Sequence, residues 1–151
     1  MKILIVKMSS LGDIIHTIPF VNILHNKLSD KVQIDWVVNN EYLSLIKNNG
    51  IIRNAIGFDR KQWLSPIGFI KTYKEIKNFS NMLKSERYDL VLDLQGLLKS
   101  ALVATIAAGK KTIGFSDARE GATIFYDIKI NAPSDIHALK KNLFFLDYFN
   151  L

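Results

Sequence analysis

Residues 2–13 read Lys-Ile-Leu-Ile-Val-Lys-Met-Ser-Ser-Leu-Gly-Asp, and the order of residue types in this stretch indicates the fold class. Residues 2–7 form a short apolar run with β-branched side chains, which predicts a buried strand. Residues 8–12 are small and polar, as in a loop, and residues 13–28 have the periodicity of an amphipathic helix. A buried strand, a short loop and a helix in this order begin a parallel βαβ unit.

The rest of the chain continues this alternation. We expect further strands and then further helices at residues 32–38, 55–58, 88–94 and 112–115, and at residues 41–47, 66–85, 97–108 and 135–149. Ser134 is the expected N-cap of the last helix, and residues 116–124 are expected to be irregular. Pro19 should kink the first helix or restart it near Ile18, because proline lacks the backbone N–H. The pattern predicts a Rossmann-like, doubly wound α/β domain with a mostly parallel sheet.

The composition fits one globular domain of 151 residues, with 48% hydrophobic and 23% charged residues. The chain has no cysteine, which excludes a disulfide framework or a thiolate metal site, and its three histidines are too dispersed for an obvious metal site. The net charge is +6. Scattered lysines on a solvated surface explain this charge most simply, although an anionic membrane or a phosphorylated substrate would also fit it. Nucleic acid is disfavoured, because no RNA-binding aromatic signature or zinc-finger spacing is present.

Ligands in such sheets bind beyond the carboxyl ends of the strands, so the loops at these ends are the candidate sites. The first of these loops contains Ser9, Ser10, Gly12 and Asp13, with neither a dinucleotide fingerprint nor a P-loop pattern. The spacing Ser10-x-x-Asp13 matches a capping box with Ser10 as the N-cap. Asp13 is therefore a helix cap or a catalytic carboxylate, and the two roles are compatible if its side chain leans toward the cleft.

Two later loops offer further polar side chains. Arg60 and Lys61 follow the expected strand at residues 55–58, where a guanidinium suits phosphate or carboxylate recognition, although a solvated charged loop is the alternative. Gln95 and Lys99 follow the expected strand at residues 88–94 and can face the cleft. The sequence between and around them has the wrong spacing for a P-loop.

The last strand-end loop contains Arg119, which is either an anion contact or one half of a surface pair with Glu120. His137 lies near the start of the last expected helix and can reach the same cleft. Neither residue type is specific by itself.

Taken in order, these stretches resemble the first half of the ADP-heptose:lipopolysaccharide heptosyltransferases. The similar stretches are residues 4–13, 16–19, 35–38, 93–100 and 118–120. Each is weak singly, whereas their order is specific and spans nearly the whole chain. Within the family, the chain resembles most the type that adds the first heptose to the inner-core keto-sugar acid Kdo.

The resemblance implies the N-terminal, acceptor-binding half of a GT-B glycosyltransferase, with residues 1–151 as one Rossmann-like domain and the C-terminal, donor-binding domain absent. It implies inverting, metal-independent and cofactor-free transfer of heptose from ADP-heptose to a Kdo–lipid A acceptor. The enzyme would act in the cytoplasm, as a peripheral protein at the inner membrane. Asp13 would be the general base. The other implied site residues are Lys7, Ser9, Ser10 and Gly12 in the catalytic loop, Arg60, Lys61 and Arg119 on the anionic groups of the acceptor, and Gln95, Lys99 and His137 as further cleft contacts.

Family enzymes are about twice as long, so we expect this chain to be a fragment that is inactive alone. Its apolar final stretch, residues 143–151, is expected to form a surface that awaits a partner. The alternatives are a heptosyltransferase that adds a later heptose, a non-enzymatic ligand-binding or signalling domain, and an oligomerisation module. A phospho-receiver is disfavoured, because it would need an acidic cluster where Lys7-Met8-Ser9-Ser10 stands.

Overall fold

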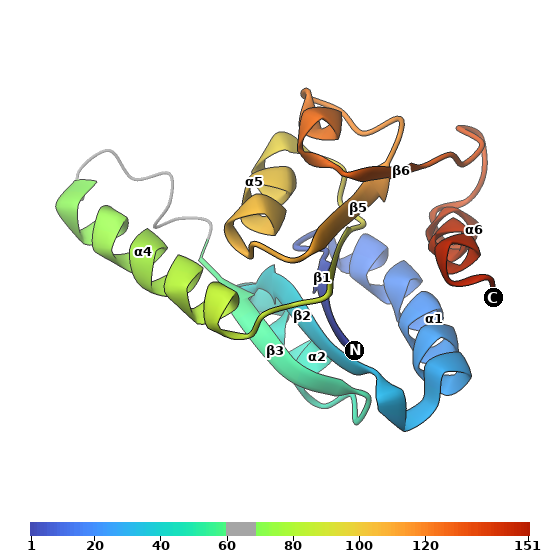
Figure 1. Cartoon of the computed structure of the whole chain (residues 1–151), viewed down its shortest axis with the longest axis horizontal. Coiled ribbons are helices and arrows are strands. Elements are labelled where there is room, and N and C mark those ends of the chain that lie inside the picture. Colours follow the sequence, from blue (N-terminus) through green and yellow to red (C-terminus); the bar gives the residue numbers. More distant parts are fainter. Residues whose placement is uncertain (60–68) are drawn as a thin grey trace.

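A computed structural model describes residues 1–59 and 69–151, and within them the strands form a six-stranded, all-parallel sheet in the order β3-β2-β1-β4-β5-β6 (Figure 1). The strands are β1 (Lys2–Val6), β2 (Gln33–Asn39), β3 (Ile52–Phe58), β4 (Leu90–Asp93), β5 (Lys111–Phe115) and β6 (Ile128–Ile130). The chain winds outward in one direction from β1 and in the other from β4, so these two strands meet at the switch point. The predicted doubly wound fold class is confirmed.

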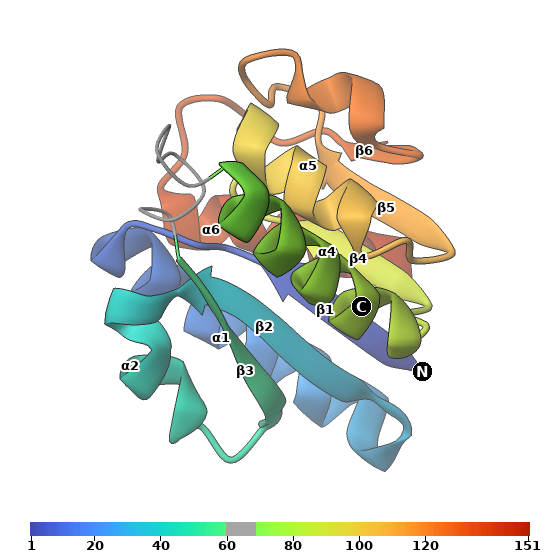
Figure 2. The same ribbon diagram turned by 90° about the vertical axis from the view of Figure 1, so that its left-hand side faces the viewer.

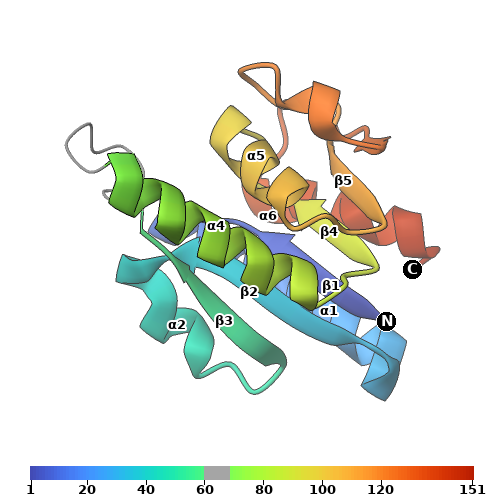
Figure 3. The ribbon, with the colours of Figure 1, turned by 60° about the vertical axis from the view of Figure 1, so that its left-hand side comes forward.

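Helices cover both faces of the sheet. They are α1 (Leu11–Leu28), α2 (Leu43–Lys47), α4 (Phe69–Ser85), α5 (Leu98–Ile106) and α6 (Ala138–Leu143). Figures 2 and 3 show α1 and α2 on one face, and α4 and α5 on the other. Ile3 and Ile5 of β1 pack into the core under α1, whereas Leu4 and Val6 pack into the core under α4 and α5. This double burial explains why the strand is apolar throughout instead of alternating with polar residues.

The first helix corrects one expectation. α1 runs without interruption through Pro19, so the predicted restart near Ile18 does not occur. Proline removes one main-chain hydrogen bond, but Ile14 lies before it and Phe20 and Leu24 lie after it, all fully buried in the core. Packing on both sides of the proline holds the two turns in one helix.

The sheet edges also differ from the expectation. β3 begins at Ile52, because its early residues pair with β2 across a register shift between Ile34 and Asp35. The region expected to be irregular contains a 3₁₀ turn at Ala122–Phe125, and the strand β6 that follows it was missed. With three residues, β6 is too short to show any periodicity.

The end of the chain corrects two further expectations. The predicted helix over residues 135–149 is wrong in its start, because α6 begins at Ala138 and its N-cap is His137 instead of Ser134. The His137 ring accepts a hydrogen bond from the Leu139 amide at 3.3 Å, and a 3₁₀ segment, Phe144–Phe149, continues the helix. The final stretch, expected as an apolar surface, belongs in part to the core, because Phe145 and Leu146 are buried, whereas Leu151 is exposed. Phe145 is fully buried and packs against the rings of α1 and β5.

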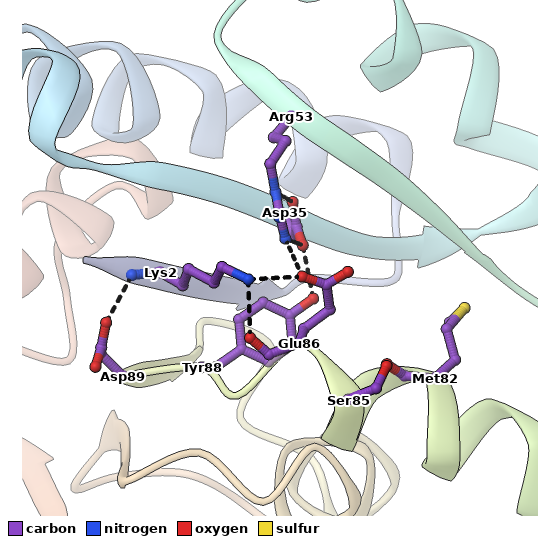
Figure 4. Close-up of polar contacts among 8 residues, drawn as sticks. All are labelled: Lys2, Asp35, Arg53, Met82, Ser85, Glu86, Tyr88 and Asp89. Carbon is purple, nitrogen blue, oxygen red and sulfur yellow. Dashed lines mark hydrogen bonds and ion pairs between the residues drawn. The ribbon is translucent and has the colours of Figure 1, made fainter.

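A cluster of charged residues joins the amino-terminal ends of the strands (Figure 4). Asp35 is fully buried and accepts hydrogen bonds from the Arg53 guanidinium, at 2.9 Å from Nε, and from the Tyr88 hydroxyl at 2.7 Å. Glu86 pairs with Arg53 at 2.6 Å and with Lys2 at 3.1 Å. Arg53 lies at the β2–β3 register shift, between Ile52, which pairs with Ile34, and Asn54, which pairs with Asp35. Burial and the neighbouring Asp35 carboxylate raise the pKa of Tyr88, so its hydroxyl remains a donor.

Candidate functional site

Two loops meet at the carboxyl edge of the sheet, where β1 and β4 lie side by side. Residues 7–10 follow β1 and lead into α1, and residues 94–97 follow β4 and lead into α5. In doubly wound sheets this edge, at the switch point, is where ligands bind. The candidate site is therefore built on these loops.

Asp13 lies in the first turn of α1, and its carboxylate serves as a helix cap. One oxygen, Oδ2, accepts hydrogen bonds from the backbone N–H of Ser10 at 3.1 Å and from the Ser10 hydroxyl at 3.2 Å. Ser10 is the N-cap, as predicted. Within the described residues Oδ1 accepts no hydrogen bond, and Asp13 is half-buried. One carboxylate can thus cap the helix and still offer an oxygen to a ligand.

The β4 loop is organised by Asp93, a fully buried carboxylate that the sequence analysis did not single out. Its Oδ1 accepts the backbone N–H groups of Gln95 at 3.0 Å and Gly96 at 3.1 Å, and its Oδ2 accepts the hydroxyls of Ser100 at 2.9 Å and Tyr126 at 2.7 Å. Burial raises the pKa of Asp93, and these hydrogen bonds oppose that shift. A carboxylate at the end of an otherwise apolar strand was the available signal, because a buried acid needs partners.

Gln95 connects the two loops. Its side-chain Oε1 accepts the backbone N–H groups of both Met8 and Ser9, each at 3.1 Å. Gln95 was expected as a cleft contact. The structure places its side-chain oxygen, Oε1, against the main chain of the loop that precedes Asp13.

Lys7 forms a second connection between the same loops. Its side chain is buried, and its Nζ donates a hydrogen bond to the carbonyl oxygen of Leu94 at 2.9 Å. Burial lowers the pKa of Lys7, whereas the nearby carboxylates of Asp13 and Asp93 raise it. The hydrogen bond to Leu94 therefore ties a buried lysine of the first loop to the loop after β4.

A cavity of about 320 Å³ opens beside these loops, and it is lined by Gln95, Gly96, Phe115, Asp117, Ala118, Arg119 and Lys141. The exposed Arg119 follows β5, and its backbone N–H donates to the carbonyl of Gly96 at 2.9 Å. Lys141 comes from α6, pairs with Asp117 at 2.5 Å and lies 4.9 Å from the centre of the Phe115 ring. Two cations and one acid around a polar cavity suit a ligand with negative charge. Lys141 was not predicted, because only the tertiary fold brings α6 to this loop.

The structure describes only some of the other predicted residues. Arg60 and Lys61 lie outside the described residues. Gly12 is exposed in the first turn of α1, and Lys99 is half-buried in the first turn of α5. His137 is exposed, and its ring packs edge-on against that of His16, with 4.6 Å between ring centres. Of the predicted residues that the structure describes, Gln95 and Arg119 line the cavity. Asp13, Lys99 and His137 do not line it, and Asp13 is connected to Gln95 through the loop at residues 8–10.

Across residues 1–59 and 69–151, no three acidic or histidine side chains are grouped so that they could hold a metal ion. In the same part of the chain, no helix has both the length and the apolar character needed to cross a membrane.

Known proteins match this chain over most of its length. The profile of glycosyltransferase family 9 (heptosyltransferase) matches residues 76–149. Lipopolysaccharide heptosyltransferase 1 of Escherichia coli K12 is 33% identical over 144 residues, which cover 93% of this chain and 45% of that protein. Its namesake from Pseudomonas aeruginosa is 36% identical over 101 residues, covering 67% of this chain and 28% of that protein.

Solved structures agree with the sequence matches. The E. coli heptosyltransferase WaaC with ADP superposes with a TM-score of 0.88 at 30% identity, covering 97% of this chain and 47% of that one. The same protein with ADP-2-deoxy-2-fluoro heptose gives a TM-score of 0.87, also at 30% identity, covering 99% of this chain and 49% of that one. The chain spans about half the length of the curated relatives it matches. It belongs to glycosyltransferase family 9, the heptosyltransferases, and corresponds to the N-terminal half of their GT-B structures.

Proposed function

We propose that this chain is the acceptor-binding half of an inverting, metal-independent and cofactor-free heptosyltransferase, which transfers heptose from ADP-heptose to the Kdo inner core of lipopolysaccharide. The position of Asp13 carries the proposal, because a half-buried carboxylate stands at the switch-point edge with one oxygen left for a ligand. The similarity to lipopolysaccharide heptosyltransferase 1 supports the choice of reaction.

The chemistry assigned to Asp13 is general base catalysis. Its Oδ1 takes the proton of the acceptor hydroxyl as that oxygen attacks the anomeric carbon of the heptose. The bond from the anomeric carbon to the phosphate oxygen breaks, and its electron pair leaves with ADP from the opposite face, so the configuration inverts. The Ser10 hydrogen bonds hold Oδ2, which orients the carboxylate for this transfer.

The acceptor would bind through its negative charges. Arg119 and Lys141 face the cavity beside the catalytic loop and suit the carboxylate of Kdo or a phosphate of lipid A. Arg60 and Lys61 remain predicted acceptor contacts, and Lys99 and His137 remain predicted cleft contacts. A lipid-linked acceptor lies in a membrane, so we propose that the protein acts in the cytoplasm, at the cytoplasmic face of the inner membrane. ADP-heptose would bind mainly to a C-terminal half.

The proposed function can be tested by comparing this chain alone with a two-domain enzyme. The 151 residues alone should not transfer heptose, because in-line attack requires acceptor and donor to be held together, and such positioning contributes up to roughly 7–11 kcal/mol of barrier reduction. We would incubate the purified chain with ADP-heptose and a Kdo-bearing acceptor. The same assay would then be run on a reconstituted enzyme, in which the chain is fused to the C-terminal half of the E. coli relative. Transfer only by the reconstituted enzyme is expected, and transfer by the chain alone would contradict the half-site assignment.

A further inference from the structure

The backbone just before Asp13 has an unusual set of partners. Three successive N–H groups, of Met8, Ser9 and Ser10, donate to side-chain oxygens: the first two to Gln95, the third to Asp13 itself. A backbone N–H group outside regular secondary structure can be paired by a side chain or by ordered water. Here Gln95 occupies two of the three N–H groups from the neighbouring loop.

From this geometry we propose that Gln95 is a positioning residue for the general base. By accepting both amides it fixes the path of the β1 loop, and through Ser10 it fixes the direction of the Asp13 carboxylate. The catalytic consequence rests on the function proposed above, whereas the structural part concerns this chain alone. Gln95 then acts through the main chain of the loop, and its carbonyl oxygen is not a substrate contact.

Gln95 can act in this way because its own backbone is fixed. Its N–H donates to Asp93 Oδ1 at 3.0 Å, and the same oxygen holds the next residue, Gly96, at 3.1 Å. Asp93 is fully buried and is also bonded to Ser100 in α5, so the β4 loop is anchored to the core of the domain. The bond from Lys7 Nζ to the Leu94 carbonyl gives the two loops a second connection.

The contact between Gln95 and the Met8 and Ser9 amides needs an acceptor oxygen on the side chain at position 95. The test variants therefore either remove or keep this oxygen. Gln95→Met keeps the length of the side chain and removes the acceptor, and Gln95→Glu keeps an acceptor in the same place. Gln33 is exposed at the start of β2, at the opposite edge of the sheet, so Gln33→Met is the matched control. None of these positions is in the hydrophobic core, so all the variants should fold.

Amide hydrogen exchange on the 151-residue chain tests the structural part. In Gln95→Met, exchange at Met8 and Ser9 should be faster by about 10-fold or more, since each amide loses its partner. Amides of the sheet, such as that of Ile5, should be unchanged. Gln95→Glu and Gln33→Met should retain slow exchange at both sites. Unchanged exchange at Met8 and Ser9 in Gln95→Met would overturn the proposal.

The reconstituted enzyme tests the catalytic part. A misplaced base should lower kcat by roughly 10–100-fold in Gln95→Met and leave both KM values of that variant within about 3-fold, and kcat alone should recover in Gln95→Glu. A rise in the acceptor KM at unchanged kcat would show that Gln95 contacts substrate, and would overturn the positioning role. If the wild-type fusion folds but transfers no heptose, the proposed function fails, and the exchange experiment still decides whether Gln95 positions the loop.

Discussion

Replacing Asp13 by Asn in the reconstituted enzyme is expected to lower turnover by roughly 10²–10⁴-fold, the range in which a general base contributes. The amide cannot take the proton of the acceptor hydroxyl at neutral pH. Its carbonyl oxygen can still accept the Ser10 N–H, so the start of α1 should persist. Initial rates of heptose transfer would measure the loss, and thermal unfolding of the same protein would show that the fold is kept.

Asp147→Asn is the matched control, because Asp147 is an exposed carboxylate in the 3₁₀ segment after α6. It should have the wild-type rate. If Asp13→Asn also turned over at the wild-type rate, Asp13 would be a helix cap only, and the base would have to be sought elsewhere.

Asp35→Ala is expected to have the largest effect on stability, a loss of about 3–5 kcal/mol in the free energy of unfolding. The substitution would leave the buried Tyr88 hydroxyl without its acceptor, and the Arg53 guanidinium would keep only its pair with Glu86. It would also release the contact across the β2–β3 register shift, so the edge strand should be the first to loosen. Urea denaturation followed by circular dichroism measures the change.

Asp35→Asn provides the comparison, because it keeps an acceptor for Tyr88 and removes the charge that pairs with Arg53. The free energy of unfolding of Asp35→Asn should lie between those of the wild-type protein and Asp35→Ala. A loss below about 1 kcal/mol in Asp35→Ala would show that the cluster is solvated in solution and contributes as little as an exposed ion pair.

The sequence predicts the centre of this fold better than its periphery. The apolar run of β1 and the capping pattern Ser10-x-x-Asp13 are local signals, so the first strand, its loop and the N-cap of α1 were predictable. β6 was not, since three residues carry no period. The last helix was misplaced because its cap is a histidine, a residue type that does not usually mark a helix start.

The candidate site was predictable only in part, for a related reason. Asp13 and Arg119 follow strands, and parallel topology places strand ends at one edge whatever the details. The contacts of Gln95 and Lys7 are long-range pairs between loops, and each joins positions more than eighty residues apart. Lys141 reaches the cavity only because α6 folds back against α1 and β5. Such long-range contacts depend on tertiary packing, which no local sequence pattern encodes.

Isothermal titration calorimetry on the purified chain tests the acceptor-side assignment most directly. The wild-type chain would be titrated separately with a deacylated, phosphorylated Kdo-bearing acceptor and with ADP-heptose. We predict binding of the acceptor, weaker binding in Arg119→Ala with only partial recovery in Arg119→Lys, and little or no heat from ADP-heptose. Tight binding of ADP-heptose with no binding of the acceptor would contradict the assignment of this half of the enzyme to the acceptor.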